Sequence, residues 1–167
     1  MKSVLVFTAG TALGIGLTAS IGSQQGQTVR DFPDLGKGLM ETSGCLGVES
    51  FQVKSGKQVV IAAWFENRKA MERWYFSDMH QGAMKKFFPT MGQGKKPFAA
   101  FKDETSPMLV IASVTPGSKP IGNGSQLAVD QIAIEGYAPI PGGVAFGGTF
   151  SPASLKVPGL VRIPVGD

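Results

Sequence analysis

The segment Gln58–Phe65, QVVIAAWF, constrains this chain more than any other, because it is apolar throughout after its first residue. A short, uninterrupted apolar run bounded by turn residues indicates a strand that is buried on both faces or lies at the centre of a sheet. The segment before it, Cys45–Val53, carries β-forming residues in partial alternation, and the turn SGK at 55–57 joins the two. The pair is therefore predicted to form a β-hairpin.

A helical segment follows the hairpin, and its apolar face changes side halfway along. At 100° per residue, the faces of the two halves lie nearly opposite each other. A straight helix cannot bury both against one sheet, so a break is predicted near Ser77 and Asp78, where either side chain can cap a new helix that starts at about Met79. His80, the one histidine of the chain, then lies in the first turn of the second helix. Alternatively, the second half packs on another partner, such as a second subunit. The two faces comprise Ala70, Met71 and Trp74, and then Phe76, Met79, Ala83 and Phe87.

Two further segments have strand character. Met108–Val114, MLVIASV, is predicted to be a strand, and residues 126–138 alternate in a way that suits a sheet edge, in this chain or in a partner chain. Residues 116–167 are predicted to form a Gly/Pro-rich, β-type C-terminal extension that begins with a linker at 116–124. Its last part, from Ala138 on, has an apolar content too high for a solvated tail. We expect an arm that covers a sheet edge or crosses a dimer interface.

The N-terminal residues 1–22 have the composition of an export signal. Lys2 precedes an apolar run at Val4–Leu17, and small and polar residues follow. The run is short and glycine-rich for a transmembrane helix. We therefore expect an exported protein, periplasmic or extracellular, with membrane attachment only if this segment stays uncleaved as an anchor. A third interpretation is that VLVFTAG is the first strand of the fold.

Composition argues against nucleic-acid and zinc binding. The net charge is +4, and the visible basic pairs, Lys85–Lys86 and Lys95–Lys96, do not form the dense stripe of a nucleic-acid-binding surface. One cysteine and one histidine cannot build a zinc site of the usual Cys/His type. Cys45 is interpreted as a small residue at the entry of a strand, with a reactive thiol as the alternative. No metal or cofactor is predicted.

The central region resembles the antibiotic-biosynthesis monooxygenase-like (ABM) domain family of the dimeric α/β barrel superfamily. The resemblance covers roughly Leu39–Val114. It rests on the hairpin entry SGCLG at Ser43–Gly47, on Trp64-Phe65-Glu66 at the end of a strand, and on a helix with an aromatic pair followed by Ser-x-x-His. In this chain the helical positions are Trp74, Tyr75, Ser77 and His80.

The resemblance implies an α+β fold, a ferredoxin-like sandwich over residues 23–115 that pairs as a homodimeric α/β barrel. Two departures stand out. If residues 1–22 are removed, no convincing first strand remains. In the haem-degrading branch of the family the haem-ligating histidine follows the helical tryptophan by ten positions, where this chain has Met84, so haem binding is not expected.

Two functions suit these features. The first is an exported dimer that binds a small apolar or aromatic ligand or has a structural role. The alternative, implied by the resemblance, is a cofactor-independent monooxygenase-like enzyme acting on a small aromatic or quinol substrate, with His80 as general base. The ordinary interpretation of His80 is a helix N-terminal residue that hydrogen-bonds locally or lines a dimer seam. The candidate pocket residues are Trp64, Trp74, Tyr75, Phe76 and Met84.

Overall fold

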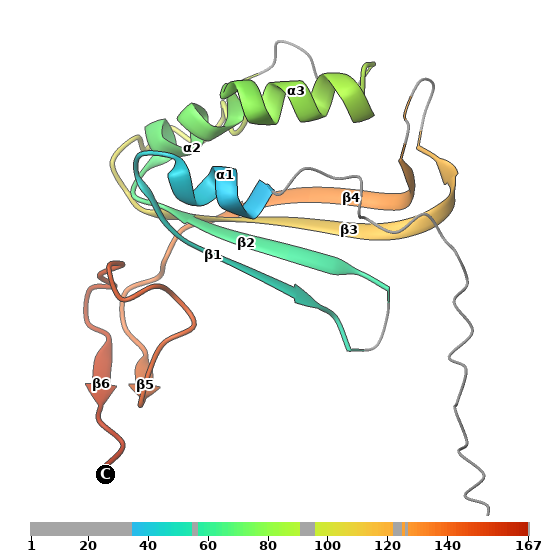
Figure 1. The fold of residues 1–167 in the computed structure, drawn as a ribbon. Helices are drawn as coiled ribbons and strands as arrows, with labels where there is room; N and C mark the ends of the chain where they lie inside the picture. Colours follow the sequence, from blue (N-terminus) through green and yellow to red (C-terminus); the bar gives the residue numbers. More distant parts are fainter. Residues whose placement is uncertain (1–34, 55–56, 91–95, 122–124, 126, 167) are drawn as a thin grey trace, which may run out of the picture.

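The computed structural model describes residues 35–54, 57–90, 96–121, 125 and 127–166. The helices lie on one face of the main sheet, and β5 and β6 lie on its other side (Figure 1). The predicted α+β class is confirmed, whereas the predicted signal or anchor, 1–22, falls outside the described residues. In chain order the elements are α1 (Leu35–Glu41), β1 (Cys45–Gln52), β2 (Val59–Phe65), α2 (Arg68–Tyr75), α3 (Asp78–Phe87), β3 (Met108–Pro120), β4 (Ala128–Tyr137), β5 (Val144–Phe146) and β6 (Val161–Ile163).

The main sheet has four antiparallel strands in the order β1-β2-β3-β4. The apolar strand β2 occupies an interior position, as its composition predicts, and Phe65 pairs with Cys45 on β1 and with Met108 on β3. The segment predicted to fill a sheet edge does so within its own chain, because β4 pairs along β3 with Ile134 opposite Ala112. The hairpin, the strand that begins at Met108 and the edge strand are all confirmed.

This sheet with helices on one face is compatible with a ferredoxin-like fold. Its strand order, however, leaves no room between β2 and β3 for the first strand of that fold. A ferredoxin-like domain seats its first strand inside the sheet, in the split β-α-β pattern. Here β2 is hydrogen-bonded to β1 on one side and directly to β3 on the other. The sheet is extended outside β3 instead, by β4.

The predicted break in the helical segment is confirmed. Helix α2 ends at Tyr75 and α3 begins at Asp78. Between them, Ser77 Oγ accepts a hydrogen bond of 3.2 Å from the backbone N–H of His80, which is the role of an N-cap side chain. The first predicted face is buried as a whole, but in the second face Phe76 and Met79 are 49% and 41% exposed. The buried residues are Ala70, Met71 and Trp74 in α2, and Ala83 and Phe87 in α3.

Ser77→Ala is expected to lower the free energy of unfolding by about 0.5–2 kcal/mol, because it leaves a backbone donor of α3 without its cap. Urea denaturation followed by far-ultraviolet circular dichroism measures this loss. Ser77→Asn keeps a capping oxygen and is the matched control, so it should stay close to the wild type. Equal losses in both variants would contradict a capping role.

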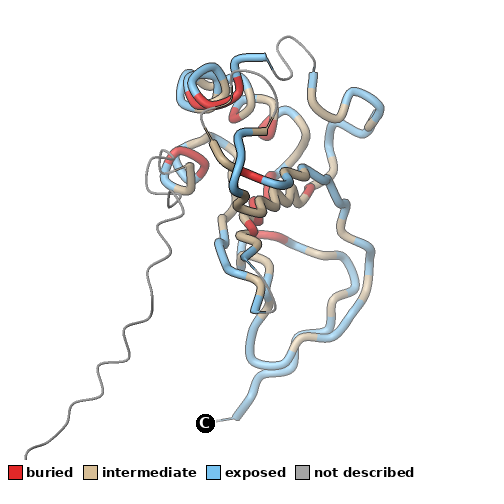
Figure 2. Tube along the Cα trace, turned by 90° about the vertical axis from the view of Figure 1, so that its right-hand side faces the viewer, coloured by how far each residue is buried: buried red, intermediate tan, exposed pale blue. Residues whose placement is uncertain are grey.

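The C-terminal arm, defined as residues 138–166, packs against the sheet face opposite the helices. Leu155 is buried against β2, where it contacts Trp64. The ring of Phe150 meets the Trp64 ring edge-on at a centroid distance of 4.9 Å. Figure 2 shows that the buried residues gather at the sheet and helices, while the far part of the arm is exposed. The arm is thus anchored at one end and open to solvent at the other.

Candidate functional site

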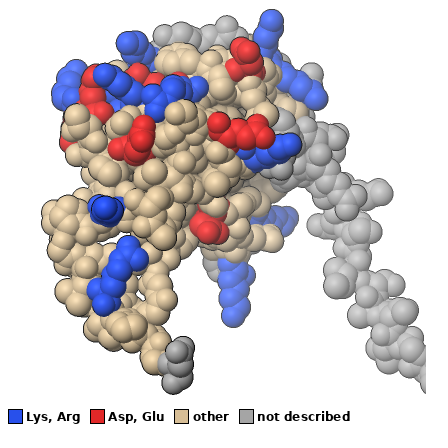
Figure 3. Space-filling view, turned by 60° about the vertical axis from the view of Figure 1, so that its left-hand side comes forward, with Lys and Arg blue, Asp and Glu red and all other residues tan. Residues whose placement is uncertain are grey.

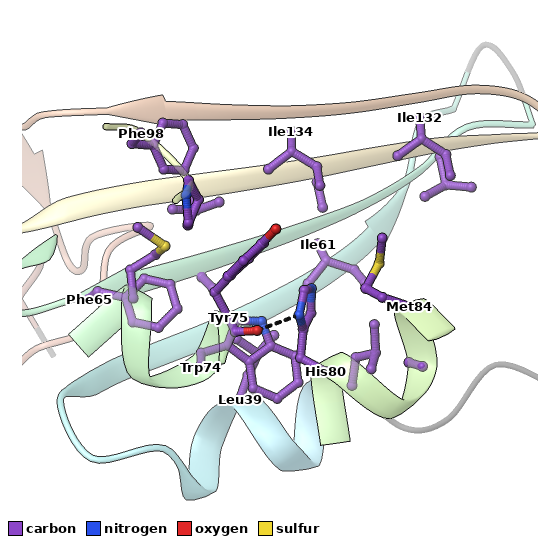
Figure 4. Close-up of a pocket in the computed structure, with 18 of the residues that line it drawn as sticks. Leu39, Ile61, Phe65, Trp74, Tyr75, His80, Met84, Phe98, Ile132 and Ile134 are labelled. Carbon is purple, nitrogen blue, oxygen red and sulfur yellow. Dashed lines mark hydrogen bonds between the residues drawn. The ribbon is translucent and has the colours of Figure 1, made fainter. Parts of the chain in front are cut away.

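An apolar cavity of about 340 Å³ lies between the helices and the main sheet. Its floor consists of helix-facing side chains of β2, β3 and β4, and its roof of side chains from the three helices and from the segment before β3. In Figure 4, side chains from the strands face those from α2 and α3 across this space. The labelled strand residues are Ile61, Phe65, Ile132 and Ile134, and the helical ones include Tyr75, His80 and Met84.

Small residues on the central strands leave this space open. Strand alternation turns Ile61, Ala63 and Phe65 toward the helices. On the neighbouring strand Ala112 pairs with Ile61 and also lines the cavity. The short side chains of Ala63 and Ala112 leave unfilled space above the middle of the sheet. Protein interiors are normally filled to close packing. An apolar hollow of this volume is within the usual range of small-molecule sites.

His80 brings a basic nitrogen to the cavity wall. Its ring extends from the start of α3 toward the sheet (Figure 4), and its Nδ1 lies 2.8 Å from the carbonyl oxygen of Tyr75. A carbonyl only accepts, so Nδ1 carries the proton in this bond, and Nε2 of the neutral ring is an acceptor. Within the described part of the chain, no protein group pairs with Nε2. The ring is held between Trp74 and Tyr75, at centroid distances of 5.4 and 4.9 Å.

Burial keeps this imidazole neutral. Desolvation lowers the pKa of His80 below its ordinary value of 6.5, and the hydrogen bond to the Tyr75 carbonyl offsets only part of that effect. At neutral pH the ring therefore presents an uncharged acceptor to an apolar space. Such a group accepts a hydrogen bond or a proton from a ligand, and it does not attract anions.

The free energy of unfolding is expected to decrease as the pH falls from about 7 to 5, because His80 takes up a proton more readily in the unfolded chain. Its folded-state pKa lies below 6.5. The free energy of unfolding therefore falls as the pH drops through the pKa that His80 has in the unfolded chain, and it levels off below the pKa of His80 in the folded protein. The depressed pKa of Asp103 affects stability at more acidic pH, below about 4. Urea denaturation across this range measures the slope, which His80→Phe should abolish; the same slope in that variant would exclude His80 as its source.

The structure brings together four of the six sequence-derived candidates. Trp74, Tyr75, His80 and Met84 all line the cavity. The other two lie elsewhere. Alternation turns Trp64 to the opposite sheet face, where Leu155 and Phe150 pack on it. Phe76 sits at the break between α2 and α3, is 49% exposed and does not line the cavity.

Phe98 is a cavity residue that sequence reasoning does not identify. It belongs to the segment before β3, and its ring packs so closely over Gly136 of β4 that a Cβ there would lie 2.9 Å from a ring carbon. Its backbone has a φ of 53°, in the left-handed region that is rare for a bulky residue. Such strain persists only where surrounding contacts impose it. No local pattern in PFAAFKDETSP signals this placement.

An arginine on α2 holds the Phe98 segment in place. The guanidinium of Arg68 donates to the carbonyl of Phe101 and to the carboxylate of Glu104. Lys69 adds a second cation 3.7 Å from the same carboxylate. Side chains of both signs gather on this side of the molecule (Figure 3). Polar contacts of Arg68 and Lys69 with residues 101–104 therefore hold the Phe98 segment of the cavity wall against α2.

The described residues contain no cluster of three or more histidine, cysteine or acidic side chains suited to a metal ion. Cys45 is half-buried, and its thiol lies 3.8 Å from the carbonyl oxygen of Gly47. Burial raises the pKa of this thiol, which keeps it protonated and poorly nucleophilic. This environment favours the interpretation of Cys45 as a small packing residue at the entry of β1.

Two further findings bear on classification. Among the helices of the described residues, none has the length and apolar character needed to cross a membrane. Comparison of the whole chain with protein-family models, with curated proteins and with solved structures finds no match.

Proposed function

We propose that this protein binds a small, flat, largely apolar ligand in the cavity between its helices and sheet, and that a hydroxyl of the ligand donates to His80 Nε2. The observation that carries the proposal is the apolar cavity of about 340 Å³ with this imidazole in its wall. Because the Tyr75 carbonyl occupies Nδ1, Nε2 is the ring nitrogen left for a ligand. A phenol or an enol has the complementary donor.

The volume limits the size of the ligand. An apolar cavity of about 150 Å³ is enough for benzene. The cavity here, at about 340 Å³, suits a ligand of two fused or linked rings. Its lining offers dispersion contacts and few hydrogen-bonding groups, so a highly polar ligand such as a sugar or a nucleotide would lose its hydration without compensation.

Binding of a naphthol, measured by calorimetry, tests the proposal. Ala112→Phe places a ring on the cavity floor and should abolish binding while the protein stays folded. In a Trp64→Phe background Trp74 is the remaining tryptophan, and a brominated phenol should quench it by contact. Failure of naphthols and related two-ring phenols to bind, or unchanged binding to Ala112→Phe, would refute the proposal.

The lone acceptor also favours a second candidate function, a cofactor-independent monooxygenase acting on a quinol. Nε2 would take the phenolic proton of a hydroquinone, and dissolved dioxygen would oxidise the quinolate. One oxygen atom forms a C–O bond to the ring, the O–O bond breaks, and the other atom leaves as water, so that hydroquinone and dioxygen give hydroxyquinone and water. The ring loses four electrons and dioxygen gains them. Oxygen uptake with a quinol panel, absent in His80→Phe, separates this activity from binding alone.

We further propose that the chain is an ABM-like protein, that it is exported, and that it forms a homodimer. Export rests on the order of charged, apolar and small residues in 1–22, and N-terminal sequencing of the secreted product would test it. The dimeric barrel implied by the resemblance stacks two sheets face to face. Here Leu155 and Phe150 already occupy part of that face, so a barrel would require the arm to move.

A further inference from the structure

The C-terminal arm carries an apolar surface that the rest of the described chain leaves uncovered. Strands β5 and β6 pair in parallel, with Val144 opposite Val161 and Phe146 opposite Ile163. Residues in register share one face of a two-stranded ribbon, and the alternate pair, Ala145 and Arg162, lies on the other. The ribbon therefore has one wholly apolar face. Its four side chains are between 40% and 67% exposed.

This ribbon face has a defined position on the molecule. Besides the contacts of Leu155 and Phe150 with Trp64, Pro152 packs so closely over Gly47 of β1 that a Cβ there would lie 3.0 Å away. Ser154 Oγ is 3.4 Å from the carbonyl oxygen of Leu46. The arm is thus attached to both β1 and β2. These contacts hold its far end, which contains β5 and β6, in a fixed place with its apolar residues exposed.

We infer that a second copy of this chain covers the ribbon face, in a two-fold dimer that packs the apolar ribbon of one arm against that of the other. A two-stranded sheet is at best marginally stable by itself, so β5 and β6 require packing on another layer. The four ribbon residues and three further exposed apolar residues of the arm, Ile140, Phe150 and Val165, together expose on the order of 800 Å² per copy. This is about what each partner contributes to an interface of standard size.

Charge favours a second copy over other occupants. Between residues 138 and 166 the charged residues are Lys156 and Arg162, and Figure 3 shows the arm almost bare of charge compared with the helical side. Arg162 lies on the face opposite Val161, so two apolar ribbon faces meet without bringing their guanidinium groups together. A lipid surface is the other candidate occupant. Its hydrocarbon region would leave the outer backbone edges of β5 and β6 without hydrogen-bond partners.

Sedimentation of the full chain tests this interface with two variants matched in charge. Phe146→Glu combined with Val161→Glu changes the net charge by −2 and places carboxylates on the ribbon face. Arg162→Glu makes the same change on the opposite face. We expect a wild-type dimer, a rise of roughly 100-fold or more in the dimer dissociation constant for the double variant, and an unchanged constant for Arg162→Glu.

Circular dichroism verifies that both variants fold, and Phe146→Ala combined with Val161→Ala replaces the glutamate pair if it does not. A monomeric wild type, or equal effects of the two charge-matched variants, would overturn the inference. So would a monomer that floats with vesicles of phosphatidylglycerol and phosphatidylcholine, because the ribbon would then bind lipid. The cavity lies on the opposite sheet face, so naphthol binding by a monomer would leave the proposed ligand site standing.

Discussion

Phe65→Ala is expected to lower the free energy of unfolding by about 3–5 kcal/mol, the largest effect on stability that we predict for a single substitution. Phe65 is 1% exposed and is the largest fully buried side chain among the described residues. Its ring packs in the cluster that joins β2 to α1, α2 and β3 and also borders the apolar cavity. Removing the ring loses both its transfer free energy and its packing contacts, and merges the vacated volume with the existing cavity.

Urea denaturation of Phe65→Ala measures this loss, and Phe76→Ala is the matched control. Both variants remove one phenylalanine ring, but Phe76 is 49% exposed, so its removal should cost less than about 1 kcal/mol. Similar losses in the two variants would mean that the cluster around Phe65 is not the main core. A Phe65→Ala loss below about 1 kcal/mol would show that the cavity collapses to fill the space.

The central fold was predictable because its signals are local. The uninterrupted apolar run of β2 is a sufficient sign of an interior strand. The helix break follows from two apolar faces that one straight helix cannot bury together, and Ser77 is a suitable cap at that point. Even the position of His80 at the start of α3 follows from this reasoning, because the cap fixes where the helix begins.

Contacts between distant residues were not predictable in the same way. Trp64 and Trp74 are equally plausible pocket residues by type, but strand register sends Trp64 to the face where Phe150 packs. Phe98 reaches the cavity because Arg68 holds the segment that follows it, through a carbonyl more than thirty positions away. Neither pairing leaves a periodic pattern. The apolar character of the arm was visible in sequence, whereas its one-sided ribbon depends on the register of β5 with β6.

Among single side chains, we expect His80 to have the largest effect on ligand affinity, by favouring ligands with a hydroxyl over ligands without one. We expect a naphthol to bind the wild type roughly 5–150-fold more tightly than the corresponding methoxynaphthalene. The two ligands share the same rings, but the ether has no proton to donate to Nε2. It would leave this acceptor buried and unpaired, which costs about 1–3 kcal/mol in an apolar site.

His80→Phe should remove the difference between the two ligands while leaving the cavity able to hold both. The variant keeps a flat ring between Trp74 and Tyr75, and Gln81 Nε2 still donates to the Tyr75 carbonyl at 2.5 Å. Calorimetry with both ligands and both proteins gives a double-mutant cycle that isolates the hydroxyl–imidazole contact. If wild type and variant prefer naphthol equally, the hydroxyl is recognised elsewhere. If neither ligand binds either protein, the cavity is not a site for two-ring aromatics.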